Sequence, residues 1–341
     1  MLQRLLFVPR VLAITVVLVF AHMIAAAGAG FVSSAPEDSA IDRQVEPENK
    51  TLAEDDPDTA DLGGADVAAS LKLLGMVVGM CVLEALAICM LLTMASAHGG
   101  KLMAGLAAAI FGVMTLQAQI EGVAFGVFQI SFAARIGMMG LGIALIVSPL
   151  SVLLFWRVRA TPGAGALTTA GDPGASRGHE HRKVPPWAAL LIGGAIYVIL
   201  YTVFGYFIAW QSPDVRAYYG GETSRGFLWH LWDLQLRVPW FIPFQFLRGC
   251  LWTVLAMLIM SLISGRWLRS GLVVGLFFAV MMNAQLLLPN PLMPEAVRLI
   301  HIAETVPSNF ILGLVLAWLI HARATERRGE SIVEVKIVLQ D

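Results

Sequence analysis

Eight apolar stretches, each long enough to cross a lipid bilayer, constrain this chain more than any other feature. They lie at about residues 11–31, 71–95, 102–121, 136–156, 187–209, 240–263, 270–288 and 299–322. A helix needs about 20 predominantly apolar residues to cross a hydrocarbon core about 30 Å thick. Backbone groups in lipid must be bonded within the segment, so a single spanning stretch forms a helix. The sequence therefore predicts an all-α fold, a polytopic integral membrane helix bundle of about eight transmembrane helices.

The composition agrees with this class of protein. Of the 341 residues, 57% are hydrophobic and only 14% are charged, which is far more apolar than a soluble domain. The net charge is −1 and no basic domain is present, so no nucleic-acid partner is expected. We expect the lipid bilayer as the surrounding medium, and a bacterial-type plasma (inner) membrane as the location.

Charge in the connecting segments predicts the orientation. Lys and Arg collect in alternate connections, as they do on the cytoplasmic side of membrane proteins. Residues 32–67, by contrast, hold eleven Asp and Glu against Arg43 and Lys50. All tryptophans except Trp252 fall near the proposed ends of spans, where an amphipathic ring prefers to lie. Both termini are therefore predicted to be cytoplasmic.

The first stretch allows two interpretations. The sequence MLQRLLFVPR, followed by an apolar run and AAAGAG, is typical of a signal peptide with a small-residue cleavage site. The apolar run is longer than the usual signal-peptide core, which favours a retained anchor. In either case the residues that follow are extracytoplasmic.

Composition divides the chain into six segments. Residues 32–67 are too acidic and too poor in apolar side chains to fold, and residues 157–186 are rich in Gly, Ala and Pro. The predicted segments are an N-terminal anchor or signal-like helix (1–31), an acidic extracytoplasmic disordered segment (32–67), a first membrane bundle half (68–156), a flexible basic cytoplasmic loop (157–186), a second membrane bundle half (187–322) and a cytoplasmic tail (323–341).

The last apolar stretch is polar on one face of its outer half. At 100° per residue, one sector of about 120° holds Arg298, His301, Glu304, Thr305 and Ser308, with Asn309 at its edge. Ionisable groups inside a membrane are costly and most often line a pathway or a site. The alternative is a structural role, in which these groups pair and hydrogen-bond between helices.

Other polar residues fall at a similar depth. Gln245 and Arg248 share a face of the sixth stretch, and we expect Arg248 to meet Glu304 or Asn309. Gln117 and Glu121 share a face of the third stretch. The predicted outward-facing polar site therefore comprises Gln117, Glu121, Gln245, Arg248, Arg298, His301, Glu304 and Asn309.

Glu84 lies deeper and is considered as a proton-linked group. A metal is not assigned, although His301 and Glu304 are three residues apart and His230 and Asp233 offer further ligands. Cys81, Cys89 and Cys250 form neither a disulfide framework nor a zinc spacing pattern, and are interpreted as buried small side chains. The cofactors and catalytic residues stay open.

Three pairs of glycines spaced four residues apart allow helices to approach closely, within the chain or across a homodimer face. They are Gly75 and Gly79, Gly122 and Gly126, and Gly271 and Gly275.

Three functional classes fit the sequence. A non-catalytic membrane component or partner subunit is slightly favoured, because the polar residues can serve the fold. The alternatives are a transporter or permease for a small polar or anionic solute, and an intramembrane enzyme acting on an outer-leaflet lipid-linked or membrane substrate. In the first class, the polar cluster holds the fold, and the acidic or basic segments engage other proteins. In the other two, a small polar or lipid-linked ligand would bind at the outer polar site.

Overall fold

A computed structural model describes residues 7–32, 62–159, 185–221, 226–290 and 293–338. Most of the acidic segment predicted at 32–67 and of the basic loop predicted at 157–186 lies outside the described residues. All the elements named within the described ranges are helices. Eight of them are long and apolar enough to cross a membrane, which confirms the predicted polytopic all-α bundle.

The spans follow the chain in the predicted order. They are built from α2 (Phe7–Val32), α3 (Leu62–Thr93), α4 with η2 and α5 (Gly99–Phe111, Gly112–Leu116 and Gln117–Ala124), α6 (Ile130–Arg159), α7 (Pro186–Phe207) with η3 (Ala209–Gln211), α10 (Phe241–Leu262), α11 (Trp267–Asn283) with η4 (Ala284–Leu287), and α12 (Glu295–Val338). The short helices α8 (Pro213–Tyr218) and α9 (Phe227–Arg237) lie between the fifth and sixth spans.

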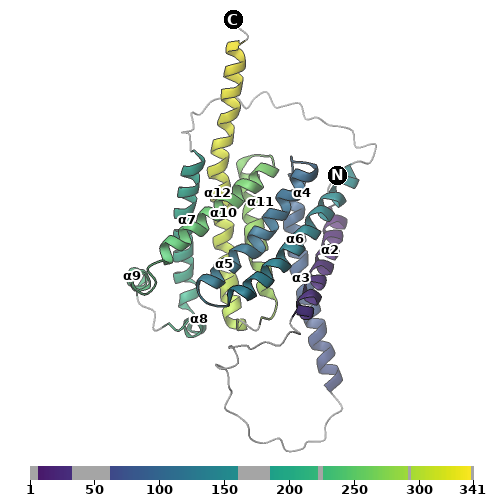
Figure 1. Ribbon diagram of the computed structural model, residues 1–341, viewed down its shortest axis with the longest axis vertical. Helices are drawn as coiled ribbons and strands as arrows, with labels where there is room; N and C mark the ends of the chain where they lie inside the picture. Colours follow the sequence, from purple (N-terminus) through teal and green to yellow (C-terminus); the bar gives the residue numbers. More distant parts are fainter. Residues whose placement is uncertain (1–6, 33–61, 160–184, 222–225, 291–292, 339–341) are drawn as a thin grey trace, which may run out of the picture.

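An even number of spans brings both ends of the bundle to the same side (Figure 1). We call this the inner side, following the prediction from charge, and the opposite side the outer side. The connections between α3 and α4 and between α10 and α11 lie on the inner side, where Ala95 and Ile263 form an isolated β-bridge. On the outer side, α8 and α9 follow α7 (Figure 1).

Glycines set the closest helix contacts. A Cβ atom added at Gly313 of α12 would lie 2.5 Å from the Cα of Gly275 on α11. A Cβ added at Gly249 of α10 would lie 2.8 Å from the Cα of Gly194 on α7. Because real Cβ contacts are longer than this, only glycine permits these backbones to approach so closely. Both contacts join helices that carry the polar residues of the outer half.

The predicted glycine pairs have different roles in the structure. Gly271 and Gly275 pack against α12 of the same chain, and Gly122 contacts Phe128. Gly126 has φ +68, a backbone conformation that favours glycine, and lies just after α5. Gly75 and Gly79 on α3 have no described atom within 4 Å of an added Cβ, so a homodimer through this face stays a prediction.

The third span contains a π-helical segment, η2, immediately before Gln117. A π segment inserts an extra residue into a helix turn, so the residues after it are rotated by about 100° relative to an uninterrupted α-helix. Gln117 and Glu121 both follow this segment, which therefore determines the direction in which they point. Gln285 of η4 donates a 3.3 Å hydrogen bond to the Met114 carbonyl within η2.

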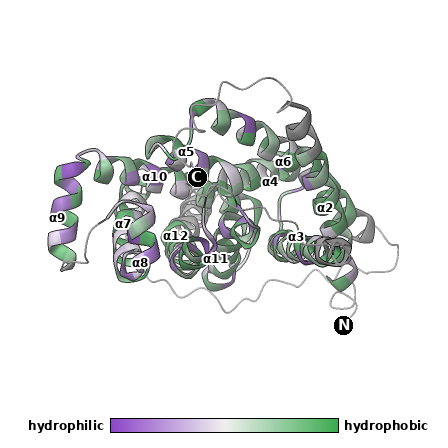
Figure 2. Ribbon diagram, turned by 90° about the horizontal axis from the view of Figure 1, so that it is seen from below, coloured by the Kyte–Doolittle hydropathy of each residue, from purple (hydrophilic) through white to green (hydrophobic). Residues whose placement is uncertain are grey.

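Helix α9 stands apart at one edge of the bundle and carries both polar and apolar residues (Figure 2). Its Leu228, Trp229, Trp232 and Leu236 are exposed. Aromatic and aliphatic side chains on a short amphipathic helix at the end of a span fit the boundary between lipid and water. Figure 1 shows it end-on while the spans run vertically, as expected for a helix lying along that boundary.

Candidate functional site

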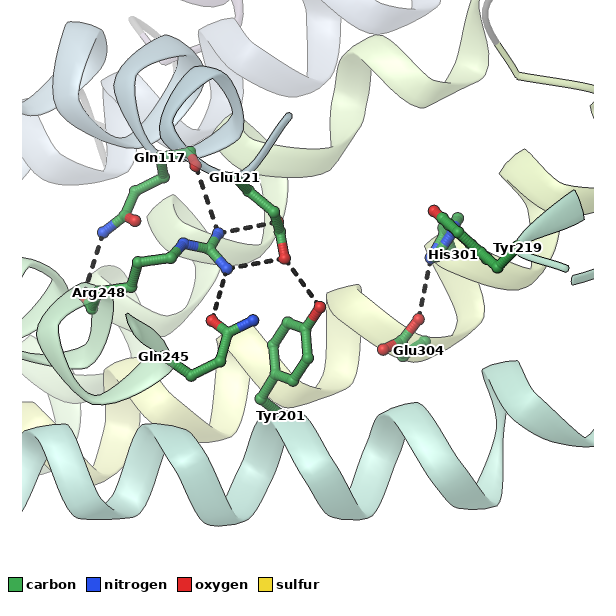
Figure 3. A network of polar contacts seen from close by, with 8 residues as sticks. All are labelled: Gln117, Glu121, Tyr201, Tyr219, Gln245, Arg248, His301 and Glu304. Carbon is green, nitrogen blue, oxygen red and sulfur yellow. Dashed lines mark hydrogen bonds and ion pairs between the residues drawn. The ribbon is translucent and has the colours of Figure 1, made fainter. Parts of the chain in front are cut away.

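Arg248 of α10 forms a two-pronged ion pair with Glu121 of α5 (Figure 3). Its Nη1 lies 2.8 Å from Oε1 of Glu121, and its Nη2 lies 2.9 Å from Oε2. Nη1 also donates to Oε1 of Gln245 at 2.8 Å, and Nη2 to the Gln117 carbonyl at 3.3 Å. A guanidinium has five N–H hydrogens, so these four contacts leave only the Nε–H. The Arg248 guanidinium is therefore fixed by groups of α5 and α10, and the Glu121 carboxylate neutralises its charge.

Aromatic side chains enclose this ion pair. Tyr201 of α7 donates a 2.8 Å hydrogen bond to Oε1 of Glu121. The guanidinium carbon of Arg248 lies 5.5 Å from the ring centroid of Tyr197 and 5.8 Å from that of Phe244, within the range of cation–π attraction. Arg248 is buried, whereas 26% of the Glu121 side chain is exposed. The carboxylate is therefore the accessible half of the pair.

A second polar cluster lies on α12 (Figure 3). Nδ1 of His301 lies 2.9 Å from Oε2 of Glu304, and Nε2 of His301 lies 3.1 Å from the Tyr219 hydroxyl. With Nδ1 donating to the carboxylate, Nε2 accepts from the tyrosine, so a neutral His301 has both ring nitrogens bonded. Partial burial raises the pKa of Tyr219, and the carboxylates of Glu121 and Glu304 raise it further. The tyrosine therefore remains a protonated donor.

Two further contacts fix α12 against the end of α11. The Thr305 hydroxyl lies within hydrogen-bond distance of Oδ1 of Asn283 and, at 2.5 Å, of the His301 carbonyl, and its single hydrogen is shared between these two acceptors. Asn283 in turn donates to the Ala279 carbonyl at 2.8 Å. Arg298 donates to the Leu288 carbonyl and so ties the start of α12 to the preceding connection.

One cavity joins the Arg248–Glu121 pair to Glu304. Its volume is ≈ 30 Å³, measured as the space open to the centre of a water molecule. Its polar lining comes from α5, α7, α10 and α12, with the apolar Leu200, Trp252 and Met282 completing the wall. The polar lining residues are Glu121, Tyr197, Tyr201, Arg248, Glu304, Thr305, Ser308 and Asn309.

The cavity lies in the outer half of the bundle. Trp252, among its deepest lining residues, is about 16 Å along the helix axis from Phe241 at the outer end of α10. Its ring contacts that of the fully buried Phe278 at a centroid distance of 4.6 Å, with the two ring planes tilted by 57°. Toward the inner side, the next buried side chains of the lining helices include Leu255 and Leu312. The buried Thr253 follows Trp252 on α10, and its hydroxyl donates to the Gly249 carbonyl of the same helix. The described side chains beneath the cavity are thus mostly apolar.

The structure brings together part of the predicted set. Glu121, Arg248, Glu304 and Asn309 line one cavity, with Gln117 and Gln245 bonded behind Arg248 and His301 bonded behind Glu304. The expected partner of Arg248 was Glu304 or Asn309, but its ion pair is with Glu121. Helix α5 approaches α10 at this level, which a periodicity argument cannot foresee. Arg298 is not among the lining residues and bonds to the connection before α12 instead.

The considered metal ligands are not assembled around His301. On α9, Asp233 pairs with Arg237 at 3.0 Å, and His230 packs its ring 4.8 Å from that of Trp210. Partial burial lowers the pKa of His230, and Asp233 opposes this shift. Among the described residues, one group of three His, Cys, Asp or Glu ligand atoms lies within 4.8 Å of one another, and it is His22, Cys81 and Glu84. Glu84, the predicted proton-linked group, is therefore not part of the outer cavity.

The chain matches no known protein family, no curated protein and no solved structure. Its chemistry must therefore be derived from the geometry. Two carboxylates and one arginine line the cavity, and the arginine is already paired. If both carboxylates are ionised, the wall carries a net negative charge, which favours cations and hydrogen-bond donors over anions.

Several residues of the site were not singled out from the sequence. Tyr197, Tyr201 and Tyr219 come from the fifth span and the connection after it, where tyrosine is common near a membrane boundary and gives no specific signal. Thr305 was noted only as part of the polar sector of the last stretch, without its partner Asn283. In each case the sequence does not reveal which residues of neighbouring helices contact one another.

Proposed function

We propose that this chain is a non-catalytic membrane component that binds a small positively charged group, such as an amine, in its outer-half cavity. The amine can belong to a free solute or to a lipid head group. The observation that carries the proposal is the position of the Glu304 carboxylate in the same cavity as Glu121, while Arg248 is neutralised by Glu121 and two backing groups. A bound ammonium would balance the remaining negative charge.

The hydroxyl and amide groups beside Glu304 support this choice. Ser308 and Asn309 line the cavity at adjacent positions of α12, next to Thr305. They offer oxygen acceptors for the remaining N–H groups of an ammonium ion. Tyr197 and Tyr201 add aromatic faces, which attract cations.

The two alternatives receive less support from the same residues. A transporter for an anionic solute would use Arg248, whose four Nη hydrogens are already bonded. A transporter also needs a polar route through the inner half, where Leu255, Phe278 and Leu312 are buried beneath the cavity. An acid–base enzyme would use Glu304 as its acid or base. It is the second candidate, because the 2.9 Å hydrogen bond from His301 orients the Glu304 carboxylate at the cavity wall.

Replacing Glu304 with Gln should remove amine binding with little change in shape. The amide oxygen can still accept the hydrogen bond from His301, but the negative charge is lost. A hydrogen bond to a charged group contributes about 1.5–3 kcal/mol, so we expect ethanolamine to bind at least about tenfold more weakly to Glu304→Gln. The measurement is the change in the midpoint temperature of thermal unfolding of the purified protein on adding ethanolamine. Sodium chloride at equal ionic strength is the reference.

The matched control is Asp233→Asn, which removes a carboxylate on α9 outside the cavity and should leave the ethanolamine shift unchanged. The same thermal unfolding experiment is repeated in bilayers that contain phosphatidylethanolamine and in bilayers that contain phosphatidylglycerol. The comparison shows whether the bound amine belongs to a lipid head group or to a free solute. Equal shifts with ethanolamine and sodium chloride would refute amine binding. So would a shift retained in full by Glu304→Gln.

A further inference from the structure

His22 of α2 and Cys81 and Glu84 of α3 form a cluster away from the outer cavity, among residues that do not line it. The possible ligand atoms of the three residues all lie within 4.8 Å of one another. Cys81 and Glu84 are three residues apart on one helix and so share a face. Both are buried, whereas 19% of the His22 side chain is exposed. Nitrogen, sulfur and oxygen donors thus meet in the hydrocarbon region.

The hydrogen bonding of His22 determines which of its nitrogens is available. Its Nδ1 lies 2.9 Å from the Leu18 carbonyl oxygen, which can only accept a hydrogen bond. Nδ1 therefore carries the proton, and Nε2 presents its lone pair toward Glu84. Metal-bound histidines are held in this way, with the second ring N–H bonded to a carbonyl or carboxylate.

Glu84 is fully buried, and neither of its carboxyl oxygens has a hydrogen-bond partner among the described residues. Its Oε2 lies 4.0 Å from Nε2 of His22. That separation is too long for a hydrogen bond, even if Glu84 carries a proton to donate. An unpartnered carboxyl in hydrocarbon is costly, so the geometry calls for a group between these two atoms.

We propose that His22, Cys81 and Glu84 bind a divalent transition-metal ion, with Zn²⁺ the best fit to this donor set. Zinc binds histidine nitrogen and carboxylate oxygen at about 2.0–2.2 Å and thiolate sulfur at about 2.3 Å. A nitrogen and an oxygen bound to one tetrahedral zinc ion lie about 3.4 Å apart. Nε2 of His22 and Oε2 of Glu84, which are 4.0 Å apart, would therefore move only slightly closer to bind the ion.

Charge balance favours the same ion. Binding releases the thiol proton of Cys81, and that of Glu84 if it is protonated, so the site becomes one thiolate, one carboxylate and one neutral imidazole. Together with a divalent cation, these ligands have no net charge. A neutral site is the form least costly to bury in a membrane. A water or another protein group can supply the fourth ligand.

The test is metal binding by the purified full chain in detergent. After treatment with a chelator, the protein is titrated with Zn²⁺, desalted, and its metal content measured by mass spectrometry. We expect about one zinc per chain, and at least about tenfold weaker binding in each of His22→Gln, Cys81→Ser and Glu84→Gln. Cys89→Ser, which changes another buried cysteine of α3, should bind as the unsubstituted chain does.

A second readout separates loss of a ligand from loss of the fold. Co²⁺ bound through Cys81 should give a thiolate-to-metal absorption band in the near ultraviolet. This band should be absent in Cys81→Ser even when the variant elutes as a folded monomer or oligomer like the unsubstituted chain. Residues 179–183 (HEHRK) lie outside the described residues and contain two further histidines. The double variant His179→Ala/His181→Ala should retain the band.

Three results would overturn the proposal. One is a folded chain that retains far less than one zinc after incubation with the ion, which would leave a protonated Glu84 as the simplest state of the cluster. Another is unchanged zinc binding in Cys81→Ser and Glu84→Gln. The third is loss of zinc and of the cobalt band in His179→Ala/His181→Ala, which would place the ion at that sequence instead.

Discussion

Replacing Arg248 with Met should lower the free energy of unfolding by about 3 kcal/mol. The variant leaves the Glu121 carboxylate beside apolar and aromatic side chains with only the Tyr201 hydroxyl as a donor. Removing one partner of a buried ion pair costs about 3–5 kcal/mol, because the other charge is left uncompensated. The lower end applies here, since 26% of the Glu121 side chain is exposed. Reversible unfolding in mixed detergent measures the loss.

The double variant Arg248→Met/Glu121→Gln distinguishes an ion pair from a general packing effect. If the loss comes from the unpaired carboxylate, the double variant should regain most of the stability of the unsubstituted chain. Arg237→Met is the matched control, because Arg237 pairs with Asp233 at 3.0 Å on the exposed face of α9. An exposed pair contributes little, so this control should change stability by less than about 1 kcal/mol. Losses that simply add in the double variant would contradict the pairing.

Replacing Gly313 with Leu should separate α12 from α11 and cost about 3 kcal/mol or more. A Cβ at this position would lie 2.5 Å from the Cα and 2.6 Å from the N of Gly275. These are backbone atoms, so the collision cannot be relieved by turning a side chain, and overpacking of this kind reaches or exceeds about 3 kcal/mol. The contact between Thr305 and Asn283 joins the same two helices and should weaken with it.

Gly142→Leu on α6 is the control for Gly313→Leu, because no described atom lies within 4 Å of a Cβ added there. It should leave the unfolding curve nearly unchanged. Equal effects of the two substitutions would show that leucine is disfavoured for a reason other than helix contact. Unfolding in detergent and the yield of folded protein after gel filtration provide the two measurements.

The spans could be predicted because two free-energy costs depend only on the local sequence. One is the exposure of apolar side chains to water, and the other is the exposure of unbonded backbone groups to lipid. The predicted stretches at 240–263 and 270–288 correspond to the spans Phe241–Leu262 and Trp267–Leu287. Length and composition alone carry this information. The polar face of the last stretch was also predictable, since a regular helix fixes the angles between His301, Glu304 and Ser308.

Contacts between helices could not be predicted in the same way. Glu121 points toward Arg248 because η2 rotates the end of the third span, and the tyrosines of α7 reach the pair because Gly194 and Gly249 let α7 approach α10. Neither effect is visible in hydropathy. The cluster at Glu84 was missed for a related reason. His22 and Cys81 lie 59 positions apart, so no spacing pattern links them, and only the packing of α2 on α3 brings them together.

We expect the cavity beside Glu304 to be open to water on the outer side and to attract cations. The most direct test is the reactivity of Ser308→Cys, in intact cells and in inverted vesicles, toward membrane-impermeant methanethiosulfonates that carry an ammonium or a sulfonate group. Ala303→Cys, on the exposed face of α12, and the unsubstituted chain with its native cysteines provide the comparisons. We predict modification of Ser308→Cys from the outer side only, several-fold faster with the ammonium reagent. Modification from the inner side, or no reaction beyond that of the two comparisons, would contradict a water-filled cavity open to the outer side.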